Sequence, residues 1–180
     1  MKLRHSTGRQ GMAAATLVAA AVFGLALSFL PLRAVEATVP KADRVLVLKS
    51  ERTMFLMKGQ AAFRIYKVAL GPKSKGHKEQ QGDGRTPEGQ YVLDARNPHS
   101  NFYRAIHISY PNEADRENAR HKGVHPGGNI LIHGLPNGMS DLGDDHALWD
   151  WTDGCIAVTN KQMDEIWQAV DNGTPIEIRP

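Results

Sequence analysis

Hydrophobic and polar residues alternate along several short runs after residue 43, and this spacing is typical of β-strands. Ala62–Leu70 alternates with a period of two, while Arg44–Lys49 and Met54–Met57 are shorter apolar runs separated by a charged turn. The turn spacing predicts an antiparallel meander over these three runs. Further strands are predicted at 90–93, 102–109, 129–133 and 175–179.

One helix is predicted with a defined start and stop. Thr159 and Gln162 form a capping-box pair, and apolar residues then recur at intervals of three and four up to Val170. Gly173 ends this helix. A second, shorter helix is predicted at 113–120. The expected fold class is therefore mainly β with one or two helices, in a single domain.

Residues 71–89 interrupt the predicted strands. They are rich in Gly, Lys, Gln and Asp, and this composition predicts a loop. A loop of this length inside a compact domain is commonly functional or mobile.

The N-terminal residues have the order of a secretory signal. A basic start is followed by an apolar run over 12–30 and by a small-residue processing site at 35–37. The apolar run is close to the length that spans a bilayer, so an uncleaved membrane anchor is the alternative. Either way, we expect export to the periplasm or cell envelope. The predicted organisation is a signal peptide or anchor over 1–37, a linker over 38–43 and one domain over 44–180.

Composition and charge exclude two classes of protein. The 180-residue chain is 41% hydrophobic and 23% charged, so disorder is not expected. It has 22 Lys and Arg against 19 Asp and Glu, but four of the former and one of the latter lie in 1–37. The remaining 18 of each sign leave the domain formally neutral, which removes the electrostatic case for nucleic acid. A membrane contact is expected only through the N-terminal segment.

The only cysteine, Cys155, cannot form a disulfide within its own chain. It is a buried apolar residue, a partner in an intermolecular disulfide, or a reactive thiol. The preceding Gly154 permits a tight turn and leaves the N–H groups of Gly154 and Cys155 to stabilise an oxyanion. The helix that begins after Thr159 supplies a dipole that favours the thiolate. These surroundings favour a nucleophile.

A cysteine nucleophile needs a base, and the chain has eight histidines. His133 is the candidate because it ends an apolar strand and precedes Gly134, which leaves the imidazole at the mouth of the strand. A structural histidine that caps the strand is the alternative. The run His-Pro-Gly-Gly at 125–128 is a further stretch that could line a site.

Metal chemistry is the competing interpretation of the same region. His133, Asp144, Asp145 and His146 could in principle converge, but their spacing matches none of the usual ligand patterns. We therefore expect no metal and no other cofactor.

Three short motifs follow one another in a specific order. They are Gly-Arg-Thr-Pro-Glu-Gly at 84–89, Ile-His-Gly at 132–134 and Thr-Asp-Gly-Cys-Ile at 152–156. Together they resemble the L,D-transpeptidase catalytic domain, the YkuD-type family of cell-wall enzymes. The resemblance covers most of 44–180.

The resemblance implies a mixed β-sandwich or barrel with the catalytic turn at one mouth, and a role in peptidoglycan biosynthesis and cell shape. It implies that Cys155 attacks a peptidoglycan stem peptide, with His133 as base and D-alanine leaving. A stem amine, a lipoprotein lysine or water then resolves the acyl-enzyme. A hydrolase or amidase of the same fold and a non-catalytic wall-binding protein are the alternative functions.

Two residues depart from the family pattern. Asp153 stands where a second histidine is common, and Ala157 stands where an arginine or asparagine is common. Both resemble the branch that includes proteins detaching lipoprotein from peptidoglycan. Asp153 either orients His133 or repels an anionic group, while Gly134 and Thr152 are expected to shape the site. Three further candidates for contact with the stem peptide are Tyr103, Arg104 and Tyr110.

Overall fold

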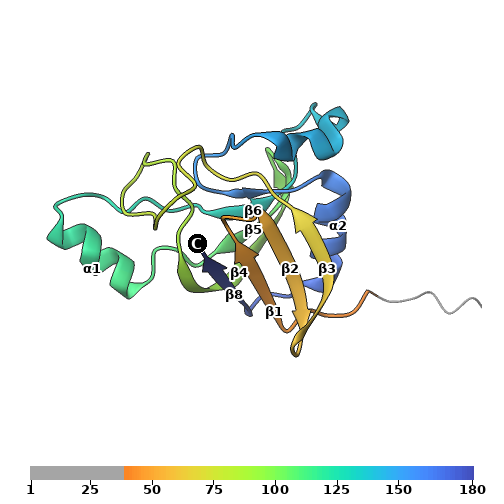
Figure 1. Ribbon diagram of the computed structural model, residues 1–180, viewed down its shortest axis with the longest axis horizontal. Helices are drawn as coiled ribbons and strands as arrows, with labels where there is room; N and C mark the ends of the chain where they lie inside the picture. Colours follow the sequence, from red (N-terminus) through yellow and green to blue (C-terminus); the bar gives the residue numbers. More distant parts are fainter. Residues whose placement is uncertain (1–38) are drawn as a thin grey trace, which may run out of the picture. The chain divides into compact units, whose positions relative to one another are not determined.

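The computed structural model describes residues 39–180, which form a mixed eight-stranded sheet with two α-helices and a 3₁₀ segment (Figure 1). The segment predicted at 1–37 lies outside the described residues. The strands are β1 (Arg44–Leu48), β2 (Thr53–Lys58), β3 (Ala61–Lys67), β4 (Gly89–Ser100), β5 (Tyr103–Ile108), β6 (Leu131–His133), β7 (Ile156–Ala157) and β8 (Thr174–Arg179). The helical segments are α1 (Glu113–His121), η1 (Ser140–Leu148) and α2 (Asn160–Ala169).

The mainly β fold and the antiparallel meander over β1, β2 and β3 are confirmed. Along β1, every second side chain is buried, as the alternating pattern predicts, and Val45 and Val47 are fully buried. These side chains belong to one apolar core that extends to β5, β6 and α2.

The remaining strands make the sheet mixed. The strand order is β3-β2-β1-β8-β4-β5-β6-β7, with β8 parallel to β1 and β7 parallel to β6. Ala69, just after β3, pairs with Ala157 of β7 through two backbone hydrogen bonds of 2.9 and 3.1 Å. This bridge joins the two ends of the strand order, so the sheet curls round to meet itself.

The predicted C-terminal helix is confirmed together with its cap. The Gln162 N–H donates to Thr159 Oγ1 over 3.1 Å, and the Thr159 N–H donates to Gln162 Oε1 over 3.0 Å. The helix buries its apolar face, including Met163 and Ile166, against the core. The predicted short helix corresponds to α1.

Three elements differ from the sequence prediction, and the first is the two-residue β7, which no predicted strand covers. β4 continues to Ser100, well beyond the predicted run at 90–93, because its polar second half pairs with β5 through two register shifts. The η1 segment was not predicted, because it has no sustained helical period and is broken at Gly143, whose φ is 48°.

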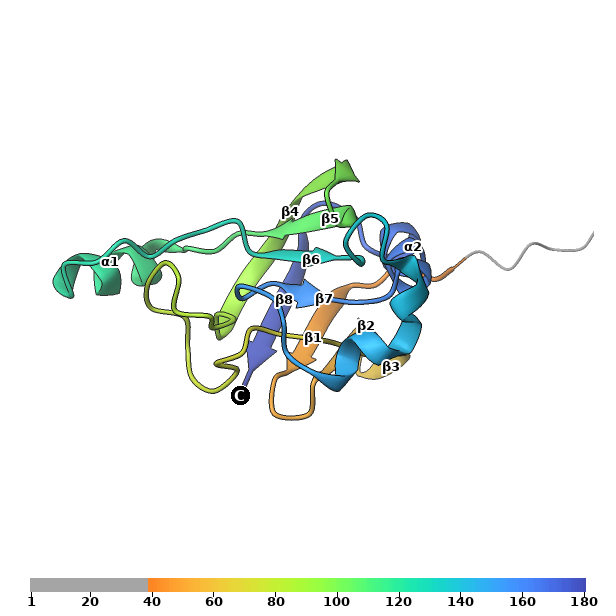
Figure 2. The ribbon, with the colours of Figure 1, turned by 90° about the horizontal axis from the view of Figure 1, so that it is seen from above.

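The 71–88 segment contains no helix or strand, as predicted. It lies beside the stretch that follows α1, and the Gln81 N–H donates to the carbonyl of His125 over 2.8 Å (Figure 2). These two stretches lie at the end of the domain that carries α1, while α2 lies at the other end (Figures 1 and 2).

Candidate active site

Cys155 lies at the end of a tight turn that leads into β7. Thr152 fixes this turn, because its hydroxyl donates to the Cys155 carbonyl over 2.8 Å and accepts the Gly154 N–H over 3.2 Å. Gly154 has a φ of 115°, which favours glycine, and a Cβ there would lie 2.4 Å from the carbonyl oxygen of Arg85. The glycine before the cysteine is therefore required by backbone shape and by the 71–88 segment that passes over it.

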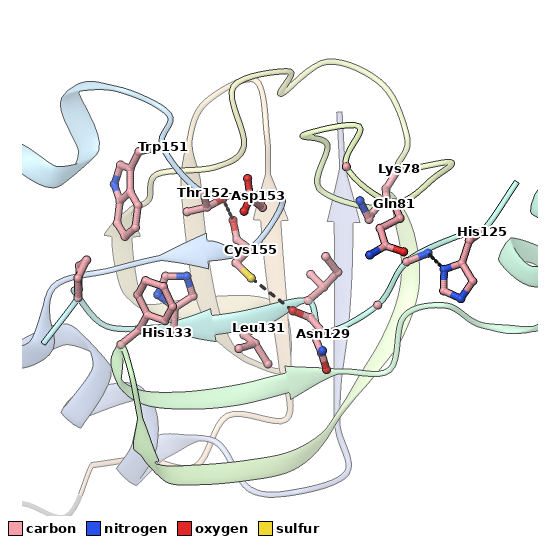
Figure 3. Close-up of a pocket in the computed structure, with 16 residues that line it drawn as sticks. Lys78, Gln81, His125, Asn129, Leu131, His133, Trp151, Thr152, Asp153 and Cys155 are labelled. Atoms are coloured by element: carbon pink, nitrogen blue, oxygen red, sulfur yellow. Dashed lines mark hydrogen bonds between the residues drawn. The ribbon is translucent and has the colours of Figure 1, made fainter.

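The parallel pairing of β6 and β7 brings the two chemical residues together. Ile132 pairs with Ile156, and His133 pairs with Ala157. Cys155 therefore lies beside Leu131, which is two residues before His133 along β6. Both side chains line one cleft, and Figure 3 shows them beside each other along it. The Cys155 thiol donates to the carbonyl of Asn129 over 3.5 Å.

The cleft has a volume of about 940 Å³ and two differing ends. Next to His133 it is bounded by aromatic rings and a proline, namely Phe102, Trp151 and Pro136. The far end is bounded by polar residues and glycines, namely Lys78, Gln81, Gly82, His125, Gly127 and Gly128. The prediction that the 125–128 run lines a site is confirmed for three of its four residues.

His133 is buried, with 2% of its surface exposed. Its Nδ1 lies 2.7 Å from the carbonyl oxygen of Gly134, and because a carbonyl only accepts, Nδ1 carries the proton and Nε2 keeps its lone pair. The rings of Phe102 and Trp151 pack against the imidazole, with centroids 4.5 and 5.8 Å away. Burial lowers the pKa of His133, the hydrogen bond to Gly134 opposes this, and nearby His146 lowers it further.

The environment of Cys155 does not favour the thiolate in the way that the nearby helix suggested. Burial raises the pKa of the thiol, a hydrogen bond from the Leu131 backbone lowers it, Asp153 raises it and Lys78 lowers it. Helix α2 begins at Asn160, after β7. The raised pKa of the cysteine and the lowered pKa of the histidine both favour the uncharged thiol and imidazole over a thiolate–imidazolium pair.

The oxyanion donors expected in the turn are reduced to one. The Gly154 N–H already donates to the Thr152 hydroxyl. Of the two amides, the Cys155 N–H is therefore the candidate oxyanion donor. Gly134 does not line the cleft, but its lack of a side chain allows close approach to α2, because a Cβ there would lie 2.6 Å from the Asn160 side-chain oxygen.

Three candidates for substrate contact lie outside the cleft lining. The Tyr103 hydroxyl donates to the carboxylate of Asp164 over 2.9 Å, and Arg104 forms an ion pair of 2.7 Å with the same carboxylate. The Tyr110 hydroxyl is directed to the carbonyl of Pro126 over 3.0 Å, and burial raises the pKa of Tyr110. The structure thus uses Tyr103 and Arg104 to hold α2, and Tyr110 to hold the stretch after α1.

Several cleft residues were missed at the level of sequence. Lys78 and Gln81 lie in a polar stretch with no periodic signal, and only the folding of the 71–88 segment brings them to the cleft. Asn129 is the first residue of the predicted strand at 129–133, where nothing marked it as a cleft residue. Trp151 is adjacent to the cysteine motif, which is the one local signal that pointed to it.

Metal binding finds no support in the described part of the chain. Among residues 39–180, no three His, Cys, Asp or Glu side chains converge on one position. His146 instead has both ring nitrogens near backbone carbonyls, at 2.9 Å from Gly143 and 3.3 Å from Ala157. In the same part of the chain, no helix combines the length and the apolar character needed to cross a membrane.

Comparison with known proteins places this chain in a family. The model of the L,D-transpeptidase catalytic domain, YkuD, matches residues 42–178, and the chain belongs to that family. A protein of Escherichia coli strain K12 named "Putative L,D-transpeptidase YafK" is 32% identical over 132 residues, which are 70% of this chain and 46% of that protein. The chain therefore spans about half the length of this curated relative.

Solved structures show the same fold. The helical cell shape determining protein Pgp2 from Campylobacter jejuni has a TM-score of 0.57 at 26% identity, over 80% of this chain and 51% of that chain. An L,D-transpeptidase from Mycobacterium smegmatis has a TM-score of 0.51 at 12% identity, over 76% of this chain and 58% of that chain. The second likeness concerns the fold alone.

Proposed function

We propose that this protein is an exported cysteine acyltransferase that acts on peptidoglycan stem peptides as an L,D-transpeptidase. The observation that carries the proposal is the arrangement of Cys155, just before β7, and His133, at the end of the adjacent parallel strand β6, lining one cleft. The fixed tautomer of His133 leaves Nε2 as a lone-pair acceptor for a proton. A structural histidine at this position would not require a cysteine beside it on the same cleft.

The proposed reaction begins with proton transfer from the Cys155 thiol to His133 as the sulfur attacks a peptide carbonyl. The C–S bond forms, the C–N bond breaks, and the proton on His133 passes to the leaving amine. The Cys155 N–H stabilises the oxyanion of the tetrahedral intermediate. An amine or water then attacks the thioester and restores the thiol.

The proposed substrate is the peptidoglycan stem peptide, cleaved after the L-centre of diaminopimelate with D-alanine leaving. The acceptor would be a second stem amine or a lysine of a wall-linked lipoprotein. A cleft of about 940 Å³ is large enough for a peptide of several residues, and its aromatic end offers apolar contact. Membership of the family supports this substrate class.

Hydrolysis of a stem or lipoprotein linkage is the second candidate function, favoured by the departures at Asp153 and Ala157. Incubation with purified muropeptides and an added D-amino acid separates the two functions. Exchange products support transfer, whereas release of D-alanine or lipoprotein without exchange supports hydrolysis.

A non-catalytic wall-binding protein is the third candidate. A carbapenem should acylate Cys155, and the adduct is seen by mass spectrometry of the intact protein. Cys155→Ala should remove both the adduct and the muropeptide activity, while retained activity in this variant would end the proposal.

Because burial lowers the pKa of His133, the acid limb of the pH profile of kcat/KM should be centred below about 6.5, the ordinary histidine value.

A further inference from the structure

Asp153 is the one acidic residue that lines the cleft, and it lies two residues before Cys155. Its side chain is exposed, and it forms no hydrogen bond or ion pair with any other residue of the 39–180 part of the chain. The lysine of the same cleft, Lys78, does not neutralise it, because Lys78 Nζ pairs with Asp83 over 2.8 Å. Beside the nucleophile, the cleft therefore carries a negative charge that no hydrogen bond or ion pair within residues 39–180 neutralises.

The hydrogen bond of His133 argues against the first role considered for Asp153, that of orienting the imidazole. The only hydrogen-bonding partner of His133 Nδ1 in the described residues is the Gly134 carbonyl, so no carboxylate orients the ring. Figure 3 shows the Asp153 side chain on the Thr152 side of Cys155, away from the His133 ring. Asp153 also raises the pKa of Cys155, so it does not serve to activate the thiol.

The charge of the leaving amine differs between the linkages that such an enzyme meets. D-Alanine carries a carboxylate one carbon from the nitrogen that leaves, so this negative charge must enter the cleft close to Cys155. The side-chain amine of a lysine residue carries no carboxylate near its nitrogen. A negative charge fixed beside the sulfur therefore discriminates between these two classes of substrate.

We propose that Asp153 is a specificity-determining residue that disfavours leaving amines bearing an adjacent carboxylate and favours amines without one, such as a lysine side chain. This inference rests on the proposed cysteine acyl chemistry, and within it favours the second candidate, cleavage of a lipoprotein linkage, over release of D-alanine. Two like charges several ångströms apart in a half-buried cleft repel enough to change a rate by about tenfold, and salt weakens the effect.

The first experiment measures the charge effect at the sulfur without any substrate. Cys155 is the only thiol of the chain, so its alkylation by iodoacetate, an anion, and by neutral iodoacetamide can be followed unambiguously by mass spectrometry. Asp153→Asn should raise the iodoacetate to iodoacetamide rate ratio about tenfold. Any change in thiol acidity affects both reagents and cancels in the ratio. Asp145→Asn, an exposed carboxylate outside the cleft lining, is the matched control and should leave the ratio unchanged.

The second experiment uses two stem peptides that differ only in the leaving group, D-alanine or D-alaninamide. The wild type should have a kcat/KM about tenfold higher for the D-alaninamide peptide than for the D-alanine peptide. Asp153→Asn should bring this ratio close to one by raising kcat/KM for the D-alanine peptide. A ratio that Asp153→Asn leaves unchanged overturns the inference, even where alkylation responds. Failure of both peptides to react, with the alkylation ratio shifted as expected, contradicts the proposed function rather than the charge effect.

Discussion

Two connecting segments border the cleft, and they are held in place in different ways. The 71–88 segment has no helix or strand, yet it is fastened by two lysines with buried side chains. Lys49 Nζ reaches into it from the end of β1 and donates to the carbonyls of Gly76 and Thr86 and to the carboxylate of Glu88, over 2.7 to 2.9 Å. Burial lowers the pKa of Lys49, which Glu88 partly offsets.

The 134–151 segment contains η1 and is held by a different set of contacts. Its anchors are the buried His146 and, at its end, Asp150, which forms an ion pair with Arg52. Between them the chain exposes large apolar side chains, with Leu148 77% exposed and Trp149 49% exposed. The lack of a helix or strand in the 71–88 segment therefore does not mean that it lacks buried anchoring contacts.

The largest effect is expected when the buried lysine is removed. Lys49→Met leaves the carboxylate of Glu88 and two carbonyls without their donor, and should lower the free energy of unfolding by about 3 kcal/mol. Urea denaturation measures this. The control is Lys41→Met, which removes an exposed ion pair with Asp171 and should cost no more than about 0.5 kcal/mol. Equal losses in the two variants would contradict the role given to Lys49.

The contact between the 71–88 segment and the cysteine turn can be broken at Gly154. Gly154→Ala should lower kcat/KM about a hundredfold, because the Cβ collides with the Arg85 carbonyl and displaces the nucleophile. Gly138→Ala, in the 134–151 segment, is the control. Its φ is also positive, at 88°, but open space surrounds the added Cβ. It should cost about 1 kcal/mol of stability and little activity, and a similar activity loss in both variants would mean that backbone strain alone explains Gly154.

Acid should leave the 71–88 segment fastened well below neutral pH. Burial would raise the pKa of Asp83, but hydrogen bonds from Lys78 and from the N–H groups of Glu79, Gln80 and Arg85 outweigh it and lower the pKa to about 2. A lowered carboxyl pKa stabilises the fold above the ordinary value, and this stabilisation is lost only as the pH falls towards 2. Hydrogen exchange should therefore show these three amides still protected at about pH 4, relative to their intrinsic rates. Loss of protection there would count against the ion pair.

The smallest effect is expected on the exposed face of the 134–151 segment. Leu148→Ser should change the free energy of unfolding by no more than about 0.5 kcal/mol, because the side chain is already 77% exposed. Thermal unfolding is sufficient to measure it. A loss above about 2 kcal/mol would show that this segment is packed as tightly as its counterpart.

Local patterns in the sequence predicted the elements that local physics dictates. Alternation identified the β1–β3 meander, and the Thr159 capping box identified the start of α2. The strand order could not be predicted, because pairing of β8 between β1 and β4 depends on contacts between distant parts of the chain.

The candidate site likewise has features that depend on neighbouring residues and features that depend on distant contacts. The Gly154–Cys155 turn and the strand end at His133 were visible as short motifs, since both depend on neighbouring residues. The opposite wall was not, because Lys78 reaches the cleft only when Asp83 and three amides hold the 71–88 segment in shape. The engagement of the Gly154 N–H by Thr152 was likewise invisible, because it depends on the rotamer of one hydroxyl.

The central position of β8 has a consequence for how the chain is made. β1 and β4 both pair with this last strand, one parallel and one antiparallel, and without it each has an open edge. During synthesis these two edges have no partner until residues 174–179 have left the ribosome. The described sheet is therefore joined between β1 and β4 only once residues 174–179 have been made.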